Sequence, residues 1–300
     1  MKEKENSMST AIYRNPFTFL EVPWLKDMPD AEVVISGIPF DMATSGRAGT
    51  RSGPGAIRNA SAHLVWDSPR WPWDFELVDR VKIADGGDVD FPYGEPDTAT
   101  DAIAANARQV LDSGKTLLSF GGDHYVTLPL LREHVRKHGP LALLHFDAHT
   151  DTYEDGTRYD HGTMFYHAVQ EGLVLPGHSV QVGIRTTYTY EGHPFTVLDA
   201  SWVNEKPVKK VIGKIREVIG DKPVYLSFDI DCLDPAFAPG TGTPVAGGLT
   251  SDRAIQIIRG LKGLDIRGMD IVEVAPAYDH AELTALAAAT LAVEMLYIRA

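Results

Sequence analysis

Cysteine is almost absent from this sequence. Cys232 is the single thiol among 300 residues, so no disulfide can form within the chain. A lone thiol is typical of proteins from a reducing compartment. Residues 1–10 are polar and rich in Lys and Glu, and they lack the apolar core of a signal peptide. Together these features predict a cytoplasmic protein.

Long apolar runs are also absent. No stretch reaches the length of a transmembrane helix, and the most apolar helical pattern, at residues 283–298, is interrupted by Glu294. A pattern of this length with an internal acid indicates a terminal helix buried in a protein core. We therefore expect no membrane partner.

Positive charge is scarce. The chain has 28 Lys and Arg residues against 41 Asp and Glu residues, which gives a net charge of −13. A nucleic-acid partner would require a basic face, so we expect none. The negative charge is compatible with a small cationic substrate, although solubility alone explains it equally well.

The signatures of several enzyme classes are missing. There is no Gly-x-Ser-x-Gly elbow and no reactive-cysteine context that would supply a covalent nucleophile. The glycine-rich residues 45–58 lack both the GxGxxG and the GxxxxGK[ST] spacing of nucleotide-binding loops. We interpret residues 45–58 as an active-site loop that leads into a helix.

Short apolar runs alternate with helical patterns along most of the chain. The expected strands are residues 32–38, 81–84, 116–120, 141–146, 179–184, 196–198, 224–228 and 266–272. The expected helices are residues 55–63, 98–113, 128–138, 163–172, 207–219, 251–261 and 282–298. Such alternation predicts an α/β fold with a mostly parallel sheet covered by helices on both faces. No linker or repeat divides the chain, so we expect residues 1–300 to form a single domain, with residues 1–15 as a flexible N-terminal segment.

Two acidic strings follow two of the most apolar strands. Asp-Ala-His-Thr-Asp at residues 147–151 follows one, and Asp-Ile-Asp at residues 229–231 follows the other. In an extended chain, side chains at alternate positions point to the same face, so the Asp and His side chains of each string are expected to converge. Buried carboxylates must be paired or coordinated, so the strings predict a metal site.

Other polar strings follow other strands. Residues 85–88, residues 121–124 and Glu273 each come directly after an expected strand. Open α/β sheets bind ligands beyond the carboxyl ends of their strands. We therefore expect all of these groups at one edge of the sheet.

With His124 added, the sequence offers six candidate metal ligands, namely His124, Asp147, His149, Asp151, Asp229 and Asp231. Carboxylates and imidazoles without a thiolate favour Mn²⁺ or a similar ion over a structural zinc. The four aspartates balance the charge of two divalent ions, so we expect two ions, with Asp147 and Asp229 as bridging ligands. Cys232 should point to the opposite face, into the core. Simpler interpretations stay open, because His124 could cap the next helix and an isolated Asp-x-Asp is often a solvated turn.

A pair of metal ions predicts a particular reaction. Two ions can share one water, and a bound metal lowers the pKa of water from about 15.7 to about 7. Hydroxide then exists at neutral pH and can attack a substrate. We therefore expect hydrolysis by a metal-bridging hydroxide.

These motifs resemble those of the ureohydrolases, the arginase and agmatinase family of binuclear manganese enzymes. The matching strings are GGDH at residues 121–124, DAHTD at 147–151, SFDIDCLDP at 227–235, GTGTP at 240–244 and VEVAP at 272–276. The resemblance extends from SGRAGTRSGPGAIR at residues 45–58 to the C-terminal helix. It implies an arginase-like three-layer α/β/α sandwich, two Mn²⁺ per chain, and a homo-oligomer, usually a trimer or a hexamer.

The resemblance also implies roles for individual residues. One metal would take His124, Asp147, Asp151 and Asp229, and its partner would take Asp147, His149, Asp229 and Asp231. His161 matches the family's proton-shuttling histidine, and Glu273 matches the glutamate that binds the substrate guanidinium. Asp151 would relay the proton of the attacking hydroxide to the leaving amine. Without the resemblance, an ordinary loop histidine is the favoured interpretation of His161, and Glu273 is interpreted equally well as a strand-end acid.

The string YDHGTMF at residues 159–165 is most similar to bacterial agmatinases, which hydrolyse agmatine to putrescine and urea. Tyr153 stands where arginases carry an asparagine that binds the amino-acid head group, which disfavours arginine. Glu154, Asp155 and Asp160 would suit a terminal ammonium, or they form a solvated loop. We expect agmatine as the substrate, in polyamine biosynthesis.

Three alternatives stay open. The same amidinohydrolase chemistry could act on guanidinobutyrate, guanidinopropionate, proclavaminate or arginine. A metal-dependent deacetylase would use a related single-zinc site, which does not need the second pair of aspartates. A non-enzymatic, metal-binding regulatory protein would keep the scaffold, although all six ligands, His161 and Glu273 are present.

Overall fold

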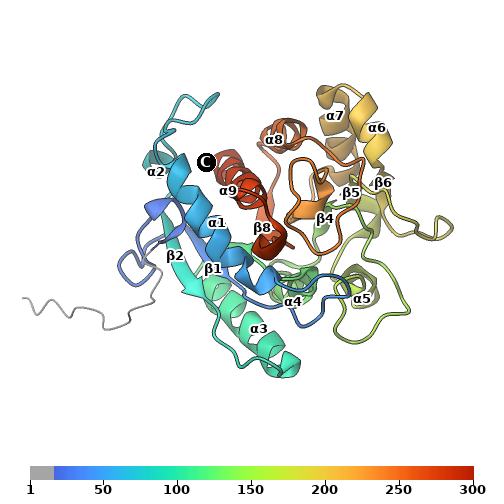
Figure 1. The fold of residues 1–300 in the computed structure, drawn as a ribbon, viewed down its shortest axis with the longest axis horizontal. Coiled ribbons are helices and arrows are strands. Elements are labelled where there is room, and N and C mark those ends of the chain that lie inside the picture. The colour runs from blue at the N-terminus through green and yellow to red at the C-terminus, as the bar shows by residue number, and fades with distance from the viewer. Residues whose placement is uncertain (1–16) are drawn as a thin grey trace, which may run out of the picture.

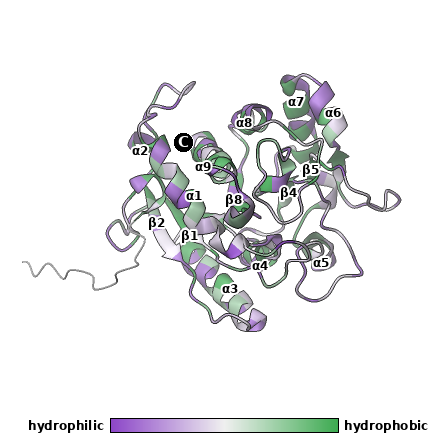
Figure 2. Ribbon diagram, in the orientation of Figure 1, coloured by the Kyte–Doolittle hydropathy of each residue, from purple (hydrophilic) through white to green (hydrophobic). Residues whose placement is uncertain are grey.

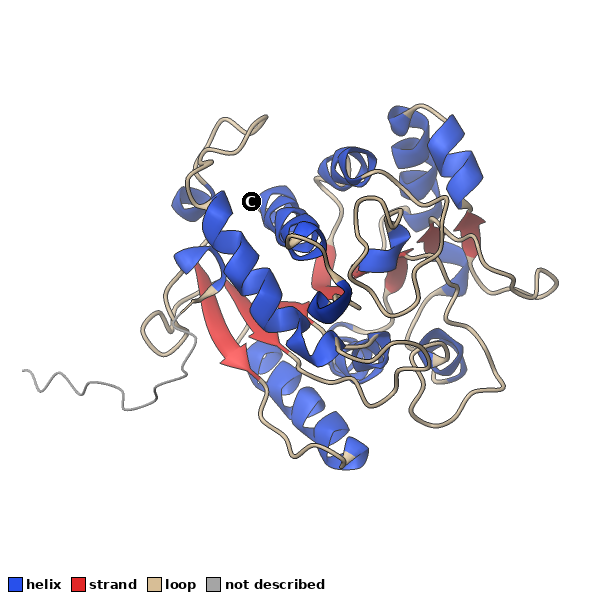
Figure 3. Ribbon diagram, in the orientation of Figure 1, coloured by secondary structure: helices blue, strands red, loops and turns tan. Residues whose placement is uncertain are grey.

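The computed structural model describes residues 17–300, and the expected flexible segment at residues 1–15 lies outside the described residues. The described chain contains an eight-stranded sheet in the order β2-β1-β3-β8-β7-β4-β5-β6 (Figure 1; Figure 3). The strands are β1 Val33–Gly37, β2 Ile83–Asp88, β3 Thr116–Phe120, β4 Ala142–Phe146, β5 Val180–Val182, β6 Thr196–Leu198, β7 Val224–Asp229 and β8 Ile266–Val272. All neighbouring strands pair in parallel, as the buried Val-, Ile- and Leu-rich runs predicted.

Helices cover both faces of the sheet, as Figure 1 shows. One layer contains α1 Gly53–Ser61, α7 Val208–Ile219, α8 Ser251–Arg259 and α9 Leu283–Arg299. The other contains α3 Pro96–Asp112, α4 Thr127–His138 and α5 Met164–Gln170. The predicted three-layer sandwich is therefore confirmed. Two short helices, α2 Leu77–Arg80 and α6 Ala200–Glu205, were not expected from the sequence, because 4 and 6 residues are too few for helical periodicity to appear.

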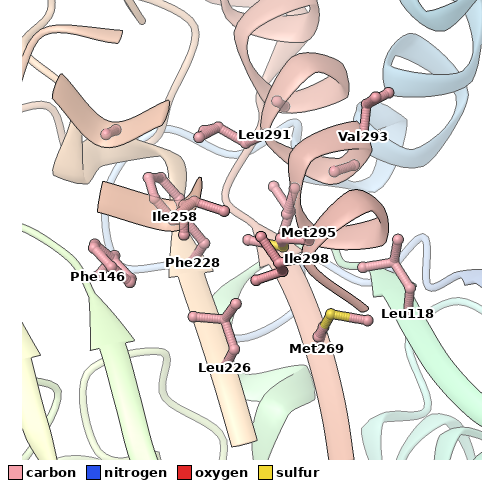
Figure 4. Packing of buried hydrophobic residues seen from close by; sticks show 14 of the residues in the cluster. Leu118, Phe146, Leu226, Phe228, Ile258, Met269, Leu291, Val293, Met295 and Ile298 are labelled. Carbon is pink, nitrogen blue, oxygen red and sulfur yellow. The ribbon is translucent and has the colours of Figure 1, made fainter. Parts of the chain in front are cut away.

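The larger hydrophobic core lies between α8, α9 and the central strands. Figure 4 shows its members Leu118, Phe146, Leu226, Phe228, Ile258, Met269, Leu291, Val293, Met295 and Ile298. Helix α9 is buried at every position of residues 288–298, and its ribbon in Figure 2 is largely in the hydrophobic colour. Burial of each large apolar side chain contributes about 1.5–3 kcal/mol, so this layer holds β7 and β8 firmly in place. No helix within residues 17–300, α9 included, has the length and apolarity needed to cross a membrane.

Four adjacent strands in the middle of the sheet end at the same edge. In sheet order they are β3, β8, β7 and β4. His124 follows β3, Glu273 follows β8 and Asp147 follows β4, while Asp229 is the last residue of β7. Because the carboxyl ends of parallel strands point in one direction, the topology brings these four groups together.

One polar string does not join this edge, which corrects an expectation from the sequence. Residues 85–88 do not follow a strand but belong to β2, the outermost strand beside β1. Asp85 is buried and accepts hydrogen bonds from Nε and Nη2 of Arg58 at 2.8 and 2.9 Å. Because β1 separates β2 from the central strands, this ion pair fastens α1 to the sheet and takes no part in the site.

Candidate metal centre

His124 faces three carboxylates. Its Nδ1 atom lies 2.9 Å from Oδ2 of Asp151, 3.2 Å from Oδ2 of Asp147 and 3.4 Å from Oδ2 of Asp229. All four side chains are buried. The loops that follow β3 and β4, together with the last residue of β7, thus deliver one group of converging donor atoms.

A second group of donors adjoins the first. The Nδ1 atom of His149 lies 3.1 Å from Oδ2 of Asp231 and 3.4 Å from Oδ1 of Asp147. Asp147 therefore contributes Oδ2 to the first group and Oδ1 to the second. The six candidate ligands lie in two adjoining groups that share Asp147.

Tight turns, rather than extended strands, bring the donors together. Oδ1 of Asp147 accepts a hydrogen bond from the backbone N of His149 at 2.6 Å, and Oδ1 of Asp229 accepts one from the backbone N of Asp231 at 2.7 Å. Asp151 has a φ of 51°, in the left-handed region. The convergence was predicted correctly, but the extended geometry given for it was wrong, because Asp side chains that bond two residues ahead fold the backbone into turns.

The orientation of His124 suits a cation. Its Nε2 atom lies 2.8 Å from Oγ of Ser227, and that hydroxyl lies 2.7 Å from Oδ1 of Asp270. The Ser227 hydroxyl donates to Asp270, so it accepts from the Nε2–H group of His124. The Nδ1 atom then presents a lone pair to the carboxylates, and it has no hydrogen-bond partner among the described residues. In metal sites, the other ring nitrogen of a ligating imidazole donates to an acceptor in this way, and that hydrogen bond fixes the orientation of the ring.

The electrostatics of both groups favour bound positive charge. Burial lowers the pKa of His124, but Asp147, Asp151 and Asp229 outweigh burial and raise it well above its ordinary value. Burial and the nearby carboxylates of Asp231 and Asp147 raise the pKa of Asp229 well above its ordinary range. Carboxylate and imidazole donors in such a negative environment fit divalent cations of the hard to borderline type.

His145 supports the shared ligand from the buried side. Its Nε2 atom lies 2.7 Å from Oδ2 of Asp147, and its Nδ1 atom lies 2.9 Å from the amide nitrogen of Gln181. The same amide nitrogen donates to the backbone oxygen of Thr150 at 2.7 Å. Nδ1 of His145 thus accepts from Gln181, and Nε2–H donates to Asp147. The sequence analysis missed His145, although a histidine within the apolar residues 141–146 was a signal.

Glu273 and His161 form a second unit beside the donor groups. Oε1 of Glu273 accepts a hydrogen bond from the backbone N of His124 at 2.9 Å and lies 2.7 Å from Nδ1 of His161. Oε2 of Glu273 is buried and has no hydrogen-bond partner within the described part of the chain. The φ of Glu273 is 64°, a conformation that costs about 1–3 kcal/mol and is typical of functional sites.

His161 connects this unit to solvent. Burial lowers the pKa of His161, but its hydrogen bond with Glu273 and the charge of that carboxylate outweigh burial and raise the pKa to about 9. On the other side of the ring, Nε2 lies 2.6 Å from Oγ of Ser45. Ser45 is exposed, so its hydroxyl lies between the buried imidazole and solvent.

Asp123 holds the loop that carries Ser45, and the sequence analysis did not assign it a role. Its Oδ2 atom accepts a hydrogen bond from the backbone N of Ala43 at 2.8 Å. Gly122 lies under the same loop, where a Cβ atom would be 1.6 Å from the backbone oxygen of Phe40. The string GGDH therefore combines one donor, His124, with residues that position the neighbouring loop.

A cavity of about 310 Å³ opens onto the donor groups and onto His161. Its lining includes His149, Asp151 and Asp229 from the donor groups, together with Ser45 and His161. Donor atoms and the His161 imidazole thus reach one space, which is large enough for a small ligand.

Known proteins share this sequence pattern. The family model described as Arginase family matches residues 31–297, a range that contains every candidate site residue. The agmatinase of Serratia proteamaculans is 60% identical over 293 residues, which cover 97% of this chain and 95% of that protein. The pattern is therefore shared over almost the whole chain.

Solved structures share the fold. The crystal structure of a hypothetical agmatinase from Burkholderia thailandensis matches with a TM-score of 0.91 and 48% identity, covering 96% of this chain and 91% of that one. Proclavaminate amidino hydrolase from Streptomyces clavuligerus matches with a TM-score of 0.87 and 37% identity, covering 95% of this chain and 97% of that one. The sandwich described above is the fold of both structures.

Proposed function

The chain belongs to the arginase family, and from this we propose that it hydrolyses the guanidinium group of agmatine to urea and putrescine. It is then an amidinohydrolase that cleaves a C–N bond of a linear amidine, in putrescine biosynthesis. The 60% identity with the agmatinase of Serratia proteamaculans supports agmatine over other guanidino compounds. The structural observation that carries the proposal is the pair of adjoining donor groups that share Asp147.

We propose that two Mn²⁺ ions per chain bind to these groups. One set of ligands is His124, Asp147, Asp151 and Asp229, and the other is Asp147, His149, Asp229 and Asp231. Two divalent ions balance the charge of the aspartates, and neutral imidazoles complete each set. When bound, such ions lower the pKa of a coordinated water from about 15.7 to about 7, which supplies the nucleophile at neutral pH.

Glu273 is the residue proposed to orient the substrate. Its Oε1 atom is fixed by the backbone of His124 and by His161, so the remaining oxygen can accept an N–H group from a guanidinium. A guanidinium carbon is a poor electrophile because resonance spreads its charge over three nitrogens. Charge-assisted hydrogen bonds from a fixed carboxylate hold this planar cation in the orientation that attack requires.

Asp151 and His161 are proposed to move the protons. Asp151 lies on the cavity wall, where it takes the proton that the attacking water loses and gives it to the amine as the C–N bond breaks. His161 exchanges its proton with solvent through the hydroxyl of Ser45. The products leave as urea and a protonated diamine.

We further infer a cytoplasmic homo-oligomer, either a trimer or a hexamer, in which residues 1–300 form one ureohydrolase domain. Cys232, predicted to lie in the core, is buried and donates a weak hydrogen bond to the backbone oxygen of Val182 at 3.4 Å. The indoles of Trp66 and Trp71 are 92% and 77% exposed, which suits burial against another subunit.

A panel of guanidino compounds tests the proposed function. Protein loaded with Mn²⁺ is incubated with agmatine, guanidinobutyrate, guanidinopropionate, proclavaminate and arginine, and urea and amine products are quantified. Agmatine should give urea and putrescine in equal amounts, with the highest kcat/KM of the panel. Metal-loaded protein that releases neither product from agmatine would overturn the proposal.

A further inference from the structure

The loop between the Asp147–Asp151 turn and α5 carries three acidic residues, and the structure places them differently. Asp160 lines the 310 Å³ cavity that holds the donor groups, together with His149 and Asp229. Asp155 lines this cavity and also a neighbouring cavity of about 360 Å³. Glu154 lines only the neighbouring cavity and not the one with the donor groups. The cavity with the donor groups therefore has two carboxylates from this loop, in addition to its candidate metal ligands.

No lysine or arginine side chain balances these two carboxylates. Arg158 is the one Arg or Lys residue of the loop, and its Nη2 atom lies 2.9 Å from Oδ1 of Asp97 in α3. Tyr159 bonds to the same carboxylate through its hydroxyl, and the Arg158 guanidinium lies over the Tyr159 ring. Arg158 is thereby held away from the cavity. Among the described residues, neither Asp155 nor Asp160 has an ion-pair partner, and no Lys or Arg lines this cavity.

The fold of the loop fixes Asp160. Its Oδ1 atom accepts a hydrogen bond from the backbone N of Gly162 at 2.8 Å. A Cβ atom at Gly156 would lie 2.1 Å from Cγ2 of Thr163 and 3.0 Å from Oδ2 of Asp160, so the two sides of the loop approach closely there. One oxygen of Asp160 is thus used to hold the turn, and the other is left for a ligand.

We propose that Asp155 and Asp160 bind the terminal ammonium of the substrate and so select a guanidino compound with a cationic tail. The inference rests on the proposed function, because it assumes that the guanidinium lies against Glu273, which contacts His161 of the cavity wall. A flexible aliphatic chain then extends past His161 toward the loop. Carboxylates that have no ion-pair partner attract an ammonium and repel a tail that ends in a carboxylate, so they also reject guanidinobutyrate and arginine.

Charge-neutralising variants test this inference with a matched control. Asp160→Asn keeps an oxygen that can accept from Gly162, so it removes the charge and preserves the turn. Asp155→Asn removes the second charge, and Glu154→Gln removes a charge of the same loop that does not face this cavity. Each variant is assayed with agmatine and with butylguanidine, which has the same chain without the ammonium.

A specific loss for the cationic substrate is the expected result. For Asp160→Asn and Asp155→Asn, kcat/KM for agmatine should fall about tenfold to a hundredfold through KM, because a charge-assisted hydrogen bond is worth about 1.5–3 kcal/mol. Turnover of butylguanidine should change less than about twofold, and the discrimination against guanidinobutyrate should weaken. Glu154→Gln should behave as the unsubstituted protein with every substrate.

Three results would overturn the inference. An equal loss for agmatine and butylguanidine in the Asn variants would show that the two residues only shape the loop. A selective loss of agmatine in Glu154→Gln would place the tail in the neighbouring cavity. Unchanged agmatine kinetics in both Asn variants would show that Asp155 and Asp160 do not contact the ammonium. Each of these leaves the proposed function intact, whereas unsubstituted protein that does not hydrolyse agmatine would overturn both.

Discussion

Nδ1 of His161 lies 2.7 Å from Oε1 of Glu273, which joins the residue proposed to move protons to the residue proposed to orient the substrate. The same Glu273 oxygen accepts from the backbone of His124, the first candidate ligand. The residues proposed for substrate binding, proton exchange and metal binding therefore meet at one carboxylate. Substitutions at these three residues should therefore affect metal binding and turnover to different extents.

His161→Asn should retain metal and lose rate. The side chain of His161 forms no hydrogen bond or ion pair with a candidate ligand side chain among the described residues, and bonds instead to Glu273 and Ser45. We expect Mn²⁺ content, measured by atomic absorption, to equal that of the unsubstituted protein. We expect kcat for agmatine to fall about a hundredfold or more, as is usual for loss of an acid–base group. A variant that loses its metal, or that keeps full kcat, would contradict the proposed role.

The raised pKa of His161 also predicts how stability depends on pH. The pKa is about 9 in the folded protein, against an ordinary value of 6.5. Below pH 6.5 both states carry the proton and the interaction with Glu273 contributes fully to stability. As the pH rises from 6.5 through 9, the unfolded chain releases its proton first and this contribution is lost.

Urea unfolding of metal-free protein measures this dependence. The difference in free energy of unfolding between the unsubstituted protein and His161→Asn should be largest below pH 6.5 and should shrink as the pH rises from 6.5 to 9. A difference that stays constant over this range, or grows with pH, would show that the His161–Glu273 pair does not titrate as described.

Ser227→Ala should weaken metal binding, although Ser227 is not itself a candidate ligand. Ser227 links His124 to Asp270, whose other oxygen accepts from Thr127 and Tyr225 at 2.8 and 2.7 Å. The substitution leaves the Nε2–H group of His124 without its acceptor, so the imidazole is no longer fixed. We expect the Kd for Mn²⁺ to rise about tenfold to a hundredfold, measured by titration calorimetry.

Ser36→Ala is the matched control for Ser227→Ala. Ser36 is a buried serine of β1 whose hydroxyl has no hydrogen-bond partner among residues 17–300. The Ser36→Ala variant should bind Mn²⁺ as tightly as the unsubstituted protein does. Equal affinities in the two variants would show that the Ser227 hydroxyl does not orient His124.

Asp229→Asn should lose metal and nearly all turnover. The Asn oxygen can still accept from the backbone of Asp231, so the turn is kept while one negative charge is removed. Because burial and neighbouring carboxylates raise the pKa of Asp229, its charge is unfavourable in the metal-free protein. Metal-free Asp229→Asn should therefore unfold at a temperature at least as high as the metal-free unsubstituted protein, in differential scanning calorimetry. Full activity in a metal-poor preparation would overturn the assignment.

The sequence was sufficient to predict the sheet because its strands are continuous Val-, Ile- and Leu-rich runs buried on both faces. Each expected strand overlaps an observed one, and the polar strings after β3, β4, β7 and β8 marked the edge where the donor groups lie. The main error at this level was residues 85–88, because the sequence does not reveal that β2 lies at the outer edge of the sheet.

The supporting residues of the site could not be predicted, because they depend on register between strands. Ser227 and Asp270 are directly opposite each other on β7 and β8, a pairing that only the folded sheet establishes. In the sequence, His145 was one interior residue of an expected strand. Its contact with Asp147 depends on the turn after β4, which the residue pattern does not indicate. Asp151 and Glu273 have positive φ values that no local pattern of residue types indicated.

Anomalous diffraction from crystals grown with Mn²⁺ tests the central proposal most directly. Two manganese peaks per chain are expected, one contacted by Nδ1 of His124 and one by Nδ1 of His149, with the carboxylate of Asp147 contacting both. A single peak, or peaks away from these two imidazoles, would contradict the binuclear centre and the chemistry derived from it.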